Sequence, residues 1–171
     1  ELSFFIPEEV FSIICNNLLE SSNDNIRIPL IGSIISLKYH QNLNQFQNQI
    51  QKVVTSIGKD NSWRVRYTLA SSVHDLLSFS IISPPLKKEI VSCYSQLFLD
   101  PEQEVRNISI SNLGSALEKL KDDSDSINLL IDSFEKAFNF ELSHIVKETV
   151  AESIVSISKY VGKPKLKSVI V

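Results

Sequence analysis

The sequence predicts an all-α protein, a right-handed α-solenoid built from about four antiparallel helix pairs. Its apolar residues recur at spacings of 3 and 4, which places them on one helical face. Glycine and proline are scarce, at 4 and 6 residues, as expected of a helix-rich chain. The dipeptide Val65-Arg66 also has counterparts at intervals of about 40 residues: Ile26-Arg27, Val105-Arg106 and Val146-Lys147. A period of this length indicates a repeat architecture, in which each unit buries its apolar face against its neighbours.

We divide the 171 residues into four units of one domain. The units cover residues 1–41, 42–80, 81–121 and 122–163, and residues 164–171 begin a further helix. The chain has no methionine and ends inside an apolar pattern, so we expect it to be a piece of a longer protein.

The first unit opens with Pro7, Glu8 and Glu9. Proline suits the first helical position, and acidic side chains suit the positive end of the helix dipole. The polar stretch Ser21–Asn25 ends this helix, and a second helix is expected to continue through Pro29 to Leu37.

In the second unit, the turn Gly58–Ser62 separates a helix around Val53 from one that runs from Ser62 to Ser78. We expect Asp60, Asn61 and Ser62 to cap the second helix, because their side-chain oxygens can accept hydrogen bonds from the unpaired amides of a first turn.

The third unit begins at Ser83-Pro84-Pro85, because consecutive prolines start helices but do not continue them. Its inner turn is Leu99–Glu102, and the polar stretch Lys121–Ser126 ends it. The fourth unit has its inner turn at Asn139–Ser143, and Gly162-Lys163-Pro164 is expected to stop its second helix.

The four units align in five columns that are apolar in every copy. The columns are Phe11, Ile50, Ile90 and Ile131; Ile14, Val53, Cys93 and Phe134; Leu18, Ile57, Leu97 and Phe138; Ile26, Val65, Val105 and Val146; and Ile34, Val73, Leu113 and Ile154. Such agreement is unlikely to arise by chance in a chain that is 43% hydrophobic. Helix pairs of this length and layout are typical of HEAT repeats.

Charge and composition argue against several classes of partner. With 17 basic and 20 acidic residues, the net charge of −3 argues against a nucleic-acid or anionic-membrane surface. No apolar run approaches the ~18 residues that a membrane span needs. The N-terminus lacks the features of a signal peptide, so we expect a cytoplasmic protein, with the nucleus as a second compartment.

The motifs of common enzymes are missing from the sequence. It has no glycine-rich phosphate loop, no nucleophile elbow and no paired metal-ligand motif. Cys15 and Cys93 lie in apolar segments, so we expect two buried, reduced thiols. We therefore predict a protein that is not an enzyme, with no cofactor, metal or small-molecule ligand.

Acidic and basic residues are paired at the turns. Asp60 precedes Arg66 by six residues, and Asp100 precedes Arg106 by six. In stacked units, an arginine can reach the turn aspartate of a neighbour, so we expect a structural ladder of ion pairs. The alternative is a basic row that contacts a ligand. The equivalent positions are Ser21 and Arg27 in the first unit, and Glu141 and Lys147 in the fourth. The ladder is therefore expected to weaken at both ends.

Trp63, the one tryptophan of the chain, stands in a turn column that is otherwise polar. Its counterparts are Asp24, Gln103 and His144. Arg64 follows it, and tryptophan and arginine are both enriched among binding hot spots. We interpret Trp63 and Arg64 as part of an interface; the alternative is that Trp63 packs across the groove between units as local core.

The stretch Asp60-Asn61-Ser62-Trp63-Arg64-Val65-Arg66-Tyr67, with Glu104-Val105-Arg106 forty residues later, resembles the central repeats of the scaffolding A subunit of protein phosphatase 2A. The resemblance implies a non-catalytic HEAT-repeat scaffold that holds a phosphatase regulatory subunit and a catalytic subunit. It implies that the regulatory subunit contacts the inner turns, here at Ser62, Trp63 and Arg64, and on the next turn at Glu102, Gln103 and Glu104.

Two other classes remain open from the sequence. A different HEAT-repeat adaptor, such as a nuclear transport receptor, would share the fold and bind other proteins. A HEAT-like DNA glycosylase would be an enzyme on the same architecture, with a basic concave face and a catalytic acid. The net charge of −3 and the single tryptophan count against the glycosylase.

Overall fold

The structure is a computed structural model that describes residues 7–37, 43–79, 82–141 and 143–160. Its regular elements within these ranges are all helical, as predicted. They are α1 (Glu8–Leu19), α2 (Asp24–Arg27), α3 (Leu30–Ser36), the 3-10 turn η2 (Leu43–Phe46), α4 (Gln47–Gly58), α5 (Trp63–Leu77), α6 (Pro84–Leu97), α7 (Gln103–Lys119), α8 (Ser124–Phe140) and α9 (His144–Ser158).

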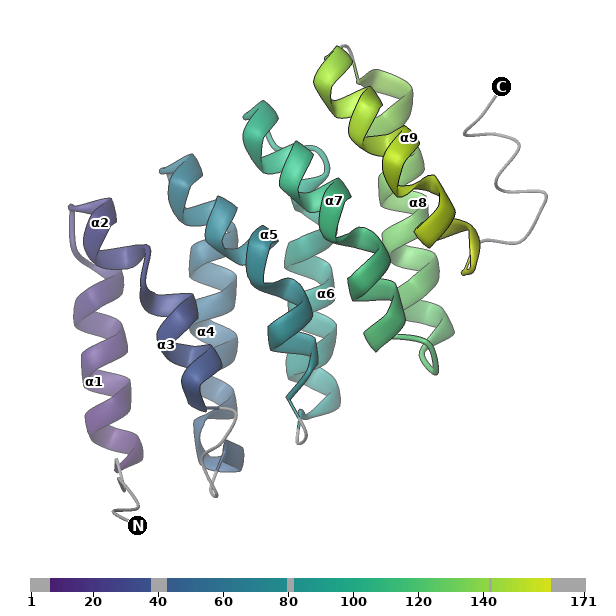
Figure 1. The fold of residues 1–171 in the computed structure, drawn as a ribbon. Helices are drawn as coiled ribbons and strands as arrows, with labels where there is room; N and C mark the ends of the chain where they lie inside the picture. Colours follow the sequence, from purple (N-terminus) through teal and green to yellow (C-terminus); the bar gives the residue numbers. More distant parts are fainter. Residues whose placement is uncertain (1–6, 38–42, 80–81, 142, 161–171) are drawn as a thin grey trace.

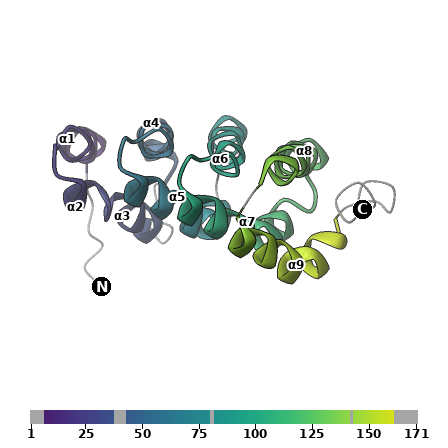
Figure 2. The ribbon, with the colours of Figure 1, turned by 90° about the horizontal axis from the view of Figure 1, so that it is seen from above.

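The helices form pairs that stack side by side into a solenoid of two layers (Figure 1). Helices α1, α4, α6 and α8 make one layer, and α3, α5, α7 and α9 make the other (Figure 2). The apolar core runs between the layers from Phe11 to Ile157. None of the helices within the described ranges combines the length and the apolar composition that a membrane crossing requires.

Most members of the aligned apolar columns are buried in this core, and the two exposed members, Ile14 and Ile26, lie in the first unit. Val53, Cys93 and Phe134 are 0 to 3% exposed, whereas Ile14 of the same column is 47% exposed. In the column of Val65, the buried valines of the later units contrast with Ile26, which is 41% exposed. Equal sequence position therefore gives equal burial only where a unit is covered by its neighbours.

The prediction that a single helix runs through Pro29 is wrong. Helix α2 ends at Arg27 and α3 begins at Leu30, so the second helix of the first unit is interrupted at this proline (Figure 1). Pro29 lies beyond the first helical turn that Asp24 opens. There the ring lacks an amide donor and clashes with the carbonyl four residues earlier.

Part of the polar link between the first two units belongs to the core. Leu43 and Phe46 of η2 are buried, and the ring of Phe46 lies 4.7 Å from that of Phe11 between centroids. The asparagines and glutamines around them gave no apolar period to detect. The expected helix stop at residues 162–164 and the further helix at 164–171 lie outside the described residues.

Both cysteines are free and buried. Burial, together with the adjacent Glu89 carboxylate, raises the pKa of the Cys93 thiol to about 12. Neither side chain is placed to act as a nucleophile, because the reactive form of cysteine is the thiolate.

Candidate protein-binding edge

The turns within the units line up along one edge of the solenoid, at the top of Figure 1. We call this the turn edge; it comprises residues 20–23, 59–62, 98–102, 141 and 143 together with the first helical turn after each. Every residue that the sequence singled out as a candidate lies on it.

Arg66 shows how the turns are held together. Its Nε and Nη2 donate to the two carboxylate oxygens of Asp100 in the next unit, at 2.6 and 2.8 Å. Its Nη1 donates to the carbonyl oxygen of Asp60 in its own turn, at 2.6 Å. One planar guanidinium thus bridges two turns, which a lysine ammonium could not do with the same geometry.

The same arrangement occurs at three successive boundaries, and we call it the arginine ladder. Its rungs are Arg27–Asp60 at 2.7 Å, Arg66–Asp100 at 2.6 Å and Arg106–Glu141 at 2.7 Å. Each arginine pairs with the acid of the following unit and donates to a carbonyl of its own turn, that of Ser21, Asp60 or Asp100.

The direction of the rungs corrects the expectation that the ladder weakens at its start. Because Arg27 uses the carboxylate of Asp60, the first unit needs no turn acid of its own. Ser21 instead accepts a hydrogen bond from the amide of Asn23 through its hydroxyl oxygen. At the other end, Lys147 occupies the arginine position and is exposed. The fourth unit contributes Glu141 as an acceptor.

The ladder acids also shape the turns in which they stand. Asp60 Oδ1 accepts from the amide of Ser62, Asp100 Oδ1 from Glu102, and Glu141 Oε1 from Ser143. Ser62 is the residue before α5, but its side chain does not cap that helix, contrary to the sequence prediction. Its hydroxyl is used in a contact with the preceding unit.

Ion pairing sets the protonation of these groups. Burial by itself would raise the pKa of Asp60, but the hydrogen bonds from Arg27 and the Ser62 amide, with the charges of Arg27 and Arg66, lower it. The pKa of Arg66 is raised, first by its hydrogen bonds to Asp100. Asp60 and Arg66 therefore both stay charged at neutral pH.

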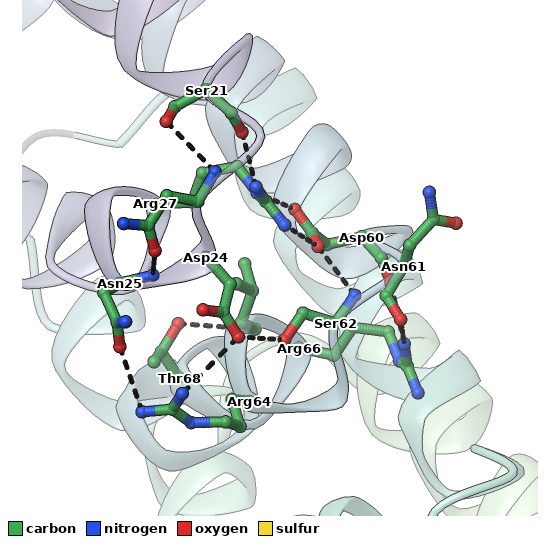
Figure 3. A network of polar contacts seen from close by, with 12 residues as sticks. Ser21, Asp24, Asn25, Arg27, Asp60, Asn61, Ser62, Arg64, Arg66 and Thr68 are labelled. Carbon is green, nitrogen blue, oxygen red and sulfur yellow. Dashed lines mark hydrogen bonds and ion pairs between the residues drawn. The ribbon is translucent and has the colours of Figure 1, made fainter.

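Ser62 and Arg64 connect the second turn to the first (Figure 3). The Ser62 hydroxyl donates to Asp24 Oδ2 at 2.8 Å, and Arg64 Nη1 lies 3.5 Å from the same oxygen. Arg64 Nη2 also donates to Asn25 Oδ1 at 3.2 Å. These contacts set the position of the guanidinium. Because it remains half-exposed, some of its donors still face solvent.

Trp63 is the first residue of α5 and is 39% exposed. Its ring makes an edge contact with Tyr67, one turn further along the same helix, at 6.4 Å between centroids. The contact with Tyr67 restricts the position of the indole, and more than a third of the residue still faces solvent.

The candidates on the third turn are less closely tied to their surroundings. Glu102 precedes α7, and its side chain is exposed, as is that of Glu104. Gln103 between them is half-buried. This turn therefore presents two carboxylates where the second turn presents Trp63 and Arg64.

Besides Ile26, two exposed apolar residues on the turn edge were missed from the sequence. Leu99, before α7, is 55% exposed, and Ile145, in the first turn of α9, is 54% exposed. Ile145 follows the fourth-unit counterpart of Trp63, so it could have been found in the column next to that of the tryptophan. The sequence contains no comparable signal for Leu99, because an apolar residue just after the end of a helix is interpreted as part of the core.

The described residues contain no group of three or more histidine, cysteine or acidic side chains that could hold a metal ion. No family model matches the sequence, and no curated protein matches it. Function is therefore inferred from the edge itself and from the local resemblance noted above.

Proposed function

We propose that this chain is part of a HEAT-type scaffold that binds other proteins along its turn edge. The observation that carries the proposal is the row of large apolar side chains exposed there: Trp63 at 39%, Leu99 at 55% and Ile145 at 54%. Apolar side chains surrounded by charged groups are typical of the centre of an interface.

The arginine ladder supports this function because it fixes the backbone beneath the exposed side chains. Each rung joins the turns of two units through two charge-assisted hydrogen bonds, and its arginine donates at least one further bond to a main-chain carbonyl. A surface that is already ordered loses less conformational entropy on binding, so more of the contact energy remains as affinity.

For the partners, we propose the regulatory and catalytic subunits of a protein phosphatase 2A, with no catalysis by this chain. The support is the resemblance of residues 60–67 to the scaffolding subunit of that family. The regulatory subunit would contact Ser62, Trp63 and Arg64, and Glu102, Gln103 and Glu104 on the next turn.

Trp63 and Arg64 have complementary tasks in this contact. The indole supplies a large apolar surface, and the half-exposed guanidinium supplies donors for a carboxylate or an amide oxygen. Because Asp24 and Asn25 already position Arg64, an acidic or amide-bearing loop of the partner would meet a pre-oriented donor set.

The test uses the full-length protein carrying Trp63→Ala and Arg64→Ala. We expect affinity for the regulatory subunit to fall about thirtyfold, the effect of losing ~2 kcal/mol at a hot spot, with binding of the catalytic subunit and the Tm unchanged. Glu118→Ala, an exposed site near the C-terminal end of α7, is the matched control. Wild-type affinity for both subunits in the double variant would reject the assigned site.

Recovery of the intact protein from its own cells tests the partner class. The phosphatase proposal requires a phosphatase catalytic subunit in the recovered complex. Recovery of transport cargo without that subunit would favour a nuclear transport receptor. Tight binding of duplex DNA at low salt would favour the glycosylase.

A further inference from the structure

Residues at the starts of α6 and α8 line a groove. The starts of these two helices lie at the edge opposite to the turn edge (Figure 1). The volume of the groove is about 750 Å³. Ile82, Val91 and Leu129 contribute apolar surface to it, and Leu129 is exposed. Lysines from α6 line one side, and aspartates from the turn before α8 and its first residues line the other.

The preceding boundary is bridged by a different contact at the equivalent point. There, Gln47 at the start of α4 accepts a hydrogen bond from the amide of Ser83 at 2.6 Å, and its side chain is buried. Lys87 holds the aligned position one unit later, and its Nζ reaches Asp123 at 3.0 Å. The lysine side chain is longer than that of glutamine, and both partners of this pair remain partly exposed, whereas Gln47 is buried.

The groove carries more acidic than basic side chains, and the excess lies on its α8 side. Lys87 and Asp123 neutralise each other, which leaves Lys88 on the α6 side and Asp122 and Asp125 on the α8 side. These three side chains are exposed, and none of them has an ion pair within the part of the chain that the structure describes. The α8 side is therefore acidic next to an apolar surface.

We propose that this groove binds a short segment of a partner protein that carries a large apolar side chain flanked by basic residues. The apolar side chain would cover Leu129 and Ile82, and the basic groups would face Asp122 and Asp125. Charge complementarity selects this occupant, because an acidic segment would meet two unpaired carboxylates at the same place. This second contact is separate from the turn edge and does not rest on the function proposed for it.

The probe is a fluorescein-labelled hexapeptide with Leu-Phe at its centre and two lysines on each side. Its anisotropy is measured on titration with the full chain. We expect saturable binding, with a loss of about tenfold for Leu129→Ala, the effect of uncovering part of one large apolar contact. A similar loss is expected for Asp122→Asn combined with Asp125→Asn.

Two matched peptides separate the groove from general attraction to an acidic protein. One replaces Leu-Phe with Ser-Gly and keeps the lysines; the other keeps Leu-Phe and replaces the lysines with glutamates. Neither should bind with comparable affinity. Trp63→Ala should leave binding of the probe unchanged, because the turn edge lies at the other side of the solenoid.

The variant with both aspartates replaced should melt like the wild type, because both side chains are exposed. Leu129→Ala should lower the melting temperature only modestly, because much of that side chain is already in water. Absence of binding up to millimolar concentrations would overturn the proposal. So would equal binding of the Ser-Gly peptide, or unchanged affinity in both groove variants.

Discussion

The first and third units have the same apolar columns but are different structures. In the third unit, α6 and α7 are continuous, and Cys93 and Val105 are buried between neighbours on both sides. In the first, the second helix is interrupted at Pro29, and the equivalent Ile14 and Ile26 are more than 40% exposed. A column predicts which face of a helix is apolar, whereas the neighbouring unit decides whether that face is buried.

Close helix packing differs between the same two units. A Cβ on Gly114 of α7 would lie 2.4 Å from Ser156 Oγ of α9, whereas a Cβ on Gly32 of α3 would meet nothing within 4 Å. The contact between α7 and α9 therefore requires a glycine at position 114. No helix contact requires the glycine at position 32. The comparison can be tested at the core, at the ladder and at these glycines.

The largest effect is expected in the column that contains both Phe134 and Ile14. Phe134 is 1% exposed and packs against Phe98 and Phe138, so Phe134→Ala should lower the free energy of unfolding by ~3–5 kcal/mol. Ile14→Ala should cost only about 1 kcal/mol, because much of that side chain is already in water. Urea unfolding measures both. Equal losses would mean that the first unit is covered in solution.

The ladder should give the next largest effect. Arg66→Ala leaves the Asp100 carboxylate, whose side chain is 3% exposed, without its ion-pair partner, and we expect a loss of about 3 kcal/mol. Lys147→Ala, at the same aligned position but exposed, should change stability by less than ~0.5 kcal/mol.

The double variant Arg66→Ala with Asp100→Ala provides the control for this prediction. It should recover part of the loss, because no buried charge is left unpaired. If Arg66→Ala has the melting curve of the wild type, the ladder does not contribute to stability.

The two glycines should respond with opposite signs. Gly114→Ala should destabilise by ~1–3 kcal/mol, because the new methyl group overlaps Ser156 and forces α7 and α9 apart. Gly32→Ala should stabilise by up to ~1 kcal/mol through helix propensity alone. Thermal melts of both variants decide this. Adding Ser156→Gly to Gly114→Ala should restore part of the loss, and a failure to do so would place the strain elsewhere.

The smallest expected effect is a pH dependence at Asp60. Its pKa is lowered in the folded protein, so the unfolded chain binds the proton more readily, and stability falls as the pH drops below about 4. The Asp60→Asn variant has no carboxyl group at this position, so its stability lacks this pH-dependent contribution. The difference in unfolding free energy between wild type and Asp60→Asn should therefore shrink from pH 6 towards pH 2.5. A difference that stays constant over this range would contradict the assignment.

Much of the fold followed from periodicity. Val65, Val105 and Val146 recur about 40 residues apart, and all three are buried at the centre of a stacked helix pair. The turns at Gly58–Ser62 and Leu99–Glu102 lie within one or two residues of the observed helix ends. Local signals suffice for these features, because helix faces and turns depend on residues a few positions apart.

The candidate edge needed the tertiary structure. The sequence placed Asp60, Arg66, Asp100 and Arg106 at the turns, but only the stacked units show that each arginine reaches forward to the next acid. The coupling of Ser62 and Arg64 to Asp24 and Asn25 joins residues 38 and 39 positions apart. No local spacing encodes such contacts, because they depend on the distance and rotation between neighbouring units.

The sequence by itself determined that this chain folds as stacked helix pairs, since its apolar columns leave each pair a face that only another pair can cover. The tertiary structure decided which members of those columns are buried, how far Trp63 is exposed, and where a groove opens between α6 and α8. The reason is that these properties depend on how closely two units approach. The boundaries are bridged by different side chains, Gln47 at one and Lys87 at the next, and their partners lie about 36 residues away in sequence.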